Sequence, residues 1–237
     1  MRTTLTILSG FLCLSLLMSN CEKTDPLIGH VYTSTGFSPD KLIAVQFFEN
    51  GQVALASFPK NFNPDKNEPV YIWNKKCDVT SYRKEDNRII ISHDFKDMYE
   101  CTIEKSKLNF SIIQAKDINI TFEIDNRFTP IKKTNKYAGK VYECVQGIKL
   151  SFISDDLIIY LEKENKPKLG SYKITDDNVV VVKLPNSGIE LIPDKETLKL
   201  SSFVGDLVFR KTEYQPTEFD IIEAIDRGAN RNISYIN

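Results

Sequence analysis

The stretch IKLSFISDDLIIYLEK, residues 148–163, predicts two antiparallel strands joined by a tight turn. Apolar and polar residues alternate in its first half, and its second half is rich in isoleucine, which favours strands over a helix. Ser154-Asp155-Asp156 lies between the two halves. Aspartate tolerates the positive φ angles that tight hairpins require, so we expect a β-hairpin here.

The same pattern occurs earlier in the chain. Gly29-His30-Val31-Tyr32 corresponds to Gly139-Lys140-Val141-Tyr142, and the segment 47–51 corresponds to 152–156. Two further matches follow in the same order, Ser81-Tyr82 with Ser171-Tyr172 and residues 103–110 with 192–200. Four matches in one order indicate an internal repeat. A duplication and a shared rhythm of strands and turns both explain it.

Each copy contains about eight predicted strands, within residues 30–125 and 140–212. Tight turns join strands two and three, four and five, and six and seven, so each copy is an up-and-down meander. Closure into a barrel removes the two exposed edges. We therefore predict an all-β protein with two tandem antiparallel barrels, at 27–128 and 137–213, a linker at 129–136, and a tail at 214–237 whose residues 219–225 form a short helix.

The motifs that the two copies share also resemble those of a known family. The Gly-x-x-Tyr opening, the hairpin that starts with Phe47 or Phe152, and the last strand Leu207-Val208-Phe209-Arg210 are similar to lipocalin-like domains of envelope lipoproteins in Bacteroidota. The resemblance covers residues 27–128 and 137–212. It implies small lipocalin-like barrels on an envelope protein. Copies of only about 75 to 100 residues leave little room for a cavity, so we expect at least the second barrel to be filled by side chains.

The first 21 residues predict where the protein is located. Arg2 precedes an apolar run at 5–18, which is shorter than the ~20 residues that a membrane-spanning helix needs, so it is typical of a cleaved signal. Met18-Ser19-Asn20-Cys21 resembles a bacterial lipoprotein signal, which implies a lipidated Cys21 as the mature N-terminus. The resemblance places the protein in the cell envelope, at the outer membrane, with the periplasmic and the exposed side both open.

Composition narrows the classes of function. The net charge is −1, with basic residues spread along the chain, so we expect no nucleic-acid partner and membrane contact only through the lipid. With two histidines and no Cys-x-x-Cys motif, we predict neither a metal nor another cofactor. His93 and Asp94 are adjacent, which on a strand points them to opposite faces, so we do not expect an enzyme.

Three cysteines remain after the signal and the lipidated residue, namely Cys77, Cys101 and Cys144. Cys77 and Cys101 are expected two strands apart, about 9.6 Å, whereas a disulfide tolerates about 7 Å between Cα atoms. We therefore expect free thiols. A bridge requires Cys77 to belong to a loop that folds over the rim.

The candidate binding residues lie at one end of the first barrel. In a meander, alternate connections share one end, and here the first copy carries two insertions, at 34–40 and 60–75. With the connection between strands five and six, they bring aromatic side chains to one predicted rim, namely Phe37, Phe62, Tyr71, Trp73 and Phe95. Long loops on a rigid barrel are typical ligand sites. Alternatively, the longer loop folds down and Trp73 and Phe62 plug the barrel.

Two functions follow from these alternatives. The first is a non-enzymatic, lipid-anchored binding module that takes a small apolar or glycan ligand at the first-domain rim. The second is a structural or partner-binding envelope protein with filled barrels and no small-molecule site. A cavity of several hundred Å³ in the first barrel favours the first, and a packed interior favours the second.

The lipid anchor gives the first testable prediction. Cys21→Ala should release the protein from membranes or leave it unprocessed, because firm anchoring takes two acyl chains. Fractionation and mass spectrometry of the N-terminus measure this. A wild-type protein that is recovered without lipid and begins at another residue would contradict it.

Overall fold

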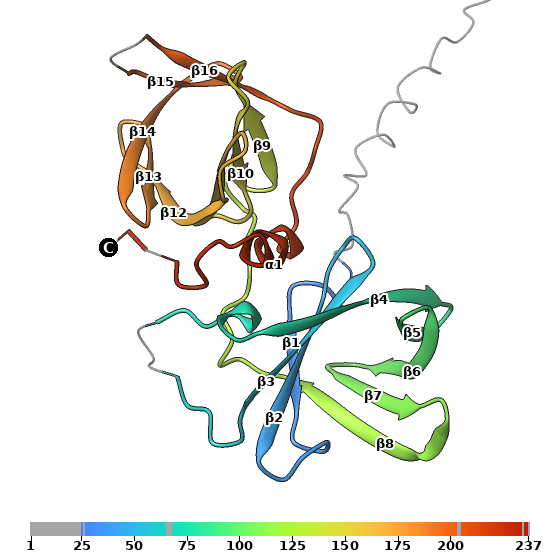
Figure 1. Ribbon diagram of the computed structural model, residues 1–237. Helices are drawn as coiled ribbons and strands as arrows, with labels where there is room; N and C mark the ends of the chain where they lie inside the picture. The colour runs from blue at the N-terminus through green and yellow to red at the C-terminus, as the bar shows by residue number, and fades with distance from the viewer. Residues whose placement is uncertain (1–24, 26, 65–67, 203–204, 234, 237) are drawn as a thin grey trace, which may run out of the picture.

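The computed structural model describes residues 25, 27–64, 68–202, 205–233 and 235–236. It confirms an all-β protein with two closed eight-stranded antiparallel barrels in tandem and one short C-terminal helix (Figure 1). The predicted signal and Cys21 lie outside the described residues. Among the residues that are described, no helix has both the length and the apolar character needed to cross a membrane.

The first barrel consists of strands β1 (Val31–Ser34), β2 (Lys41–Phe47), β3 (Gln52–Pro59), β4 (Cys77–Glu85), β5 (Arg88–His93), β6 (Lys96–Glu104), β7 (Lys107–Ile112) and β8 (Ala115–Ile124). The second consists of β9 (Lys140–Glu143), β10 (Ile148–Phe152), β11 (Leu157–Glu162), β12 (Lys168–Ile174), β13 (Val180–Leu184), β14 (Ser187–Asp194), β15 (Thr197–Leu200) and β16 (Leu207–Lys211). A single turn of 3-10 helix, η1 (Ile72–Asn74), and the helix α1 (Phe219–Asp226) complete the described elements.

Within each barrel, every strand pairs with the next one along the chain, as the meander predicts. In the first barrel β8 returns to β1, with Tyr32 opposite Ile124. In the second β16 returns to β9, with Lys211 opposite Tyr142. The connections β1–β2, β3–β4, β5–β6 and β7–β8 therefore lie at one end of the first barrel, which we call the mouth end, and the other hairpins lie at the opposite end.

The repeat matches reappear as one aromatic cluster in each barrel. In the first barrel the ring of Phe47 meets Tyr82 edge-on, with centroids 5.0 Å apart at 90°. In the second barrel Phe152 meets Tyr172 in the same way, at 4.8 Å and 84°. The tyrosine of each Gly-x-x-Tyr opening, Tyr32 or Tyr142, packs edge-on against the same phenylalanine. The repeat is thus a repeat of packing as well as of strand order.

Side chains fill the interior of both barrels. The interior of the first is packed with buried residues from seven of its strands, among them Val45, Val53, Ile89, Leu108 and Phe122. The interior of the second is packed by Leu150, Val182, Leu191, Leu198, Phe209 and their neighbours. An eight-stranded barrel is just wide enough for this. Cys77, Cys101 and Cys144 are free thiols, as predicted, and the latter two are buried.

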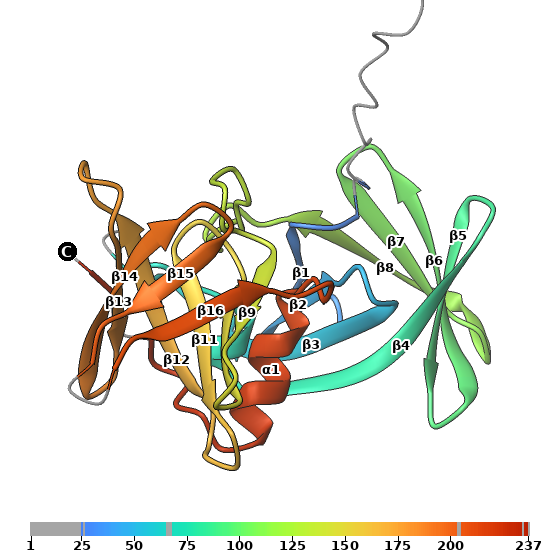
Figure 2. The same ribbon diagram turned by 90° about the horizontal axis from the view of Figure 1, so that it is seen from above.

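The predicted C-terminal helix forms and ends where expected. Ile221 and Ile222 of α1 are buried, and Gly228, with φ of 99°, ends the helix by donating its N–H to Ile225 O at 2.9 Å. Figure 2 shows α1 between the second barrel and strands β2 and β3 of the first. The helix therefore belongs to the junction between the barrels.

The tyrosine hydroxyls of the repeat differ in their surroundings, which gives a prediction. Tyr172 donates to Ser154 O at 2.6 Å and accepts from Asn135 Nδ2 at 2.9 Å. Tyr82 donates to Phe48 O at 2.9 Å, but that carbonyl also accepts the N–H of Gly51. Tyr172→Phe should cost about 1–3 kcal/mol of unfolding free energy, because buried partners lose their bond, and Tyr82→Phe about 1 kcal/mol or less. Denaturant unfolding measures both, and a larger loss for Tyr82→Phe would refute the comparison.

Candidate functional site

The structure separates the five predicted rim aromatics into two groups. Phe37 and Phe95 lie at the mouth end of the first barrel, on the β1–β2 and β5–β6 connections. Phe62, Tyr71 and Trp73 belong to the insertion between β3 and β4, which packs against the outside of the barrel. The expectation that this insertion brings its aromatics to the mouth is therefore wrong, and so is the alternative that Trp73 plugs the barrel.

The outer faces of β2 and β3 explain why the insertion folds outward. Leu42 and Ala44 pair with Phe58 and Ala56 across these strands, and all four are buried on the side away from the barrel interior. An apolar outer face needs a cover. The insertion supplies it, since Phe62 packs on Phe58 with ring centroids 4.8 Å apart.

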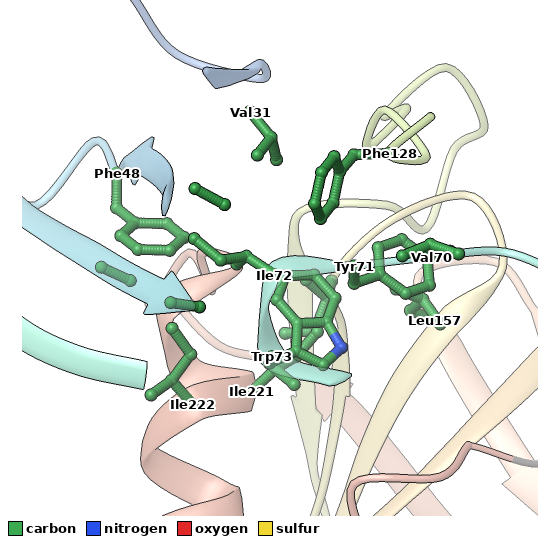
Figure 3. Close-up of a cluster of buried hydrophobic side chains, with 14 of the residues drawn as sticks. Val31, Phe48, Val70, Tyr71, Ile72, Trp73, Phe128, Leu157, Ile221 and Ile222 are labelled. Carbon is green, nitrogen blue, oxygen red and sulfur yellow. The ribbon is translucent and has the colours of Figure 1, made fainter. Parts of the chain in front are cut away.

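Tyr71 and Trp73 form the centre of a core between the barrels (Figure 3). Their rings stack 4.6 Å apart at an angle of 6°, and the side chains are 3% and 1% exposed. The same buried cluster includes Leu157 from β11 and Ile221 and Ile222 from α1. One apolar core therefore joins the outer face of the first barrel, the insertion, the outer face of the second barrel and the helix.

Hydrogen bonds hold the predicted linker to both barrels. At its start, Thr129 donates its N–H to Val70 O at 2.7 Å and accepts the N–H of Val70 with its hydroxyl at 2.9 Å. At its end, Asp155 accepts the N–H groups of Thr134 at 2.6 Å and Asn135 at 2.8 Å. These bonds hold the pKa of the Asp155 carboxyl below its usual range. The linker is therefore a fixed part of the junction.

The mouth end of the first barrel holds an open recess of about 530 Å³. Its apolar lining includes Leu55, Ile91 and Tyr99, which also belong to the interior cluster of the barrel. Asp78 lies opposite Leu55 on the neighbouring strand, so its side chain shares the inward face. The recess is therefore an opening into the top of a barrel whose deeper part is filled.

An irregularity of the sheet turns Met98 toward this recess. Ile91 pairs with Tyr99 and Ser92 with Asp97, so Met98 is an extra residue on β6 without a partner on β5. Such a β-bulge changes the direction of a side chain and is common at barrel rims and beside binding sites. Met98 lines the recess and is 37% exposed.

Exposed apolar side chains gather at this end. Of the seven large apolar side chains exposed in the described residues, four lie here: Phe37, Phe95, Met98 and Ile118. Phe95 is fully exposed, and its φ of 63° lies in the left-handed region, which costs a bulky residue about 1–2 kcal/mol. Full exposure to solvent and a left-handed backbone are both unfavourable for phenylalanine. Strained positions of this kind cluster at ligand sites, which makes Phe95 a candidate binding residue.

The polar groups of the recess suit binding better than reaction. Burial raises the pKa of the Cys77 thiol to about 12, so this lining residue is protonated and a poor nucleophile at neutral pH. His93 Nε2 lies 3.7 Å from Asp94 Oδ2, but both side chains are largely exposed. Next to the rim, hydrogen bonds from Arg83 lower the pKa of Asp97 to about 2. Asp78 and Thr80 also line the recess.

Sequence reasoning missed Met98, Ile118 and the inner lining of the recess. Alternation alone places Met98 on the outer face, next to Tyr99 on the inner one, and a bulge leaves no clear mark in a single sequence. The sequence did, however, contain a signal that the insertion between β3 and β4 packs on the outer face of the barrel. The run from Leu42 to Phe48 is almost continuously apolar, which is typical of a strand that is buried on both faces.

The burial of Trp73 gives a prediction for the only tryptophan of the chain. Trp73→Ala should lower the free energy of unfolding by about 3–5 kcal/mol, because it removes buried surface and leaves a cavity between the barrels. The fluorescence of the wild-type residue should be blue-shifted and protected from acrylamide. A red-shifted, accessible emission with a loss below about 0.5 kcal/mol, as at exposed positions, would contradict this position.

Comparisons with known proteins give no relative of this chain. No protein-family model, curated protein or solved structure matches the chain. The features of the chain that bear on its function are therefore the recess, the bulge at Met98 and the exposed Phe95.

Proposed function

We propose that the protein is a non-enzymatic, lipid-anchored envelope lipoprotein that binds a small apolar ligand at the mouth of its first barrel. The observation that carries this proposal is the fully exposed Phe95, held in a left-handed turn beside an apolar recess of about 530 Å³. The volume is typical of small-molecule sites. The apolar lining favours an apolar ligand over a glycan.

The position of Asp25, shortly after the proposed lipidation site, supports access to this mouth from solution. Asp25 forms an ion pair with Lys84 beside the β4–β5 hairpin, at the end of the barrel opposite the mouth. Residue 25 follows the proposed lipidation site, Cys21, by four residues, which span at most about 14 Å. A barrel anchored in this way has its mouth on the side away from the membrane surface. A ligand would then come from the aqueous side.

A second candidate is a structural or partner-binding envelope protein without a small-molecule site. The filled interiors of both barrels favour it, because the recess does not continue into a deep cavity. In that case the exposed apolar residues at the mouth would contact another protein. The two candidates differ in whether a small apolar molecule alone is enough to fill the site.

Phe95→Gly separates binding from stability. It should weaken the binding of N-phenyl-1-naphthylamine, a neutral apolar fluorophore, because the exposed ring is lost. The same change should raise the free energy of unfolding by up to about 1 kcal/mol, because glycine adopts the left-handed turn without a Cβ clash. Fluorescence titration and denaturant unfolding measure the two effects.

Val145→Ser is the matched control, because Val145 is also exposed, at 87%, but lies on a turn of the second barrel. This variant should bind the fluorophore like the wild type. Equal binding by wild type and Phe95→Gly would remove Phe95 from the site. A wild-type protein that binds no fluorophore would exclude the small-ligand proposal and favour the partner-binding candidate.

A further inference from the structure

A second recess lies at the junction of the barrels, away from the mouth. Its volume is about 640 Å³, and three distant parts of the chain line it. Glu68 and Asn74 come from the insertion of the first barrel, Asp156 from the β10–β11 hairpin of the second, and Arg231 and Asn232 from the C-terminal tail. Junctions between domains are frequent positions of ligand sites.

Trp73 lines this recess, and its indole carries a buried hydrogen-bond donor without an acceptor. The indole Nε1 of Trp73 is buried, and within the described part of the chain it has no hydrogen-bond partner. In Figure 3 the nitrogen lies on the edge of the indole turned away from Phe48, toward the side where Leu157 of the second barrel lies. Leaving a buried N–H unpaired costs about 1–3 kcal/mol. The nitrogen is closed off from the recess itself, so a ligand bound there changes the surroundings of the indole without reaching its N–H.

The tail is held over the recess by specific contacts. Tyr71 and Tyr235 both line the recess, and burial raises the pKa of Tyr235 to about 12. Lys183 Nζ donates to Tyr235 O at 2.6 Å, which ties the tail to β13 of the second barrel. Arg231 and Asn232 are thereby placed opposite the insertion. The recess thus depends on the arrangement of both barrels.

The charges of the recess narrow the chemistry of a ligand. The recess is lined by two carboxylates, Glu68 and Asp156, and by one guanidinium, Arg231. This excess of negative charge disfavours an anionic ligand. Among the described residues no cluster of three or more His, Cys, Asp or Glu side chains could hold a metal ion. Carboxylates and the asparagine carbonyl accept hydrogen bonds, whereas the guanidinium and amide groups donate them. Hydroxyl groups, which do both, match this mixture.

We propose that the recess is a second binding site, which takes a neutral saccharide. The ring faces of Tyr71 and Trp73 stack on each other and are almost fully buried, so the sugar is held through polar groups rather than by stacking. Its hydroxyl oxygens accept hydrogen bonds from Arg231 and from the amide of Asn232, and its hydroxyl groups donate hydrogen bonds to Asp156 and Glu68. Because the site contains groups from both barrels, saccharide binding stabilises their arrangement.

The fluorescence of Trp73 tests this proposal directly. The protein is titrated with glucose, N-acetylglucosamine, maltose, cellobiose and diacetylchitobiose, while tryptophan emission and the unfolding temperature are recorded. At least one sugar should give a saturable change in emission together with a higher unfolding temperature. No saturable change with any of the five would overturn the proposal.

Arg231→Ala and Arg210→Ala form a matched pair for the same titration. Arg231 lines the recess, whereas Arg210 is exposed on β16 and is not part of the lining. Arg231→Ala should weaken saccharide binding at least about tenfold, the effect of losing a hydrogen bond to a charged group, and Arg210→Ala should leave it unchanged. Equal effects of the two substitutions, or none for Arg231→Ala, would also overturn it.

Discussion

The arrangement of this protein depends on one constraint, namely that both barrels have apolar outer faces which must be covered. Phe58 on β3 and Leu157 on β11 belong to the same buried cluster, although they lie on different barrels. Neither face would be covered in an isolated barrel. The insertion, the linker and α1 all pack where these faces meet, with Trp73 at the centre (Figure 3). The two copies are therefore joined by a hydrophobic core and not only by a chain connection.

This constraint explains how the two copies differ. Both keep the same aromatic cluster around Phe47 or Phe152, which sets the barrel packing. The long insertion of the first copy is used at the junction, and the shorter connection of the second copy leaves room for α1. With the insertion folded outward, the mouth of the first barrel stays open, and the exposed Phe37 and Phe95 remain at its rim. The recess between the tail and the insertion is a second consequence of the same junction.

Much of the fold could be predicted from the sequence, because its signals are local. Alternation identifies the strands, and turn residues such as Asn178, with φ of 62°, mark the hairpins. Phe95 lies at the mouth end of the first barrel, where it was predicted, because the turn between β5 and β6 is also a local signal. The direction of the insertion between β3 and β4 is not local, because it depends on which distant apolar face its aromatics meet. Tyr71 and Trp73 were therefore assigned to the rim, and Met98 was missed because a bulge alters alternation at one residue only.

We expect the two barrels to unfold as one cooperative unit, because they share the core around Trp73. Scanning calorimetry of the protein tests it most directly, since a shared core couples the unfolding of its parts. The expected result is a single transition whose calorimetric enthalpy equals its van't Hoff enthalpy. Two separable transitions, each with the enthalpy expected for one barrel, would show that the barrels unfold independently and would contradict it.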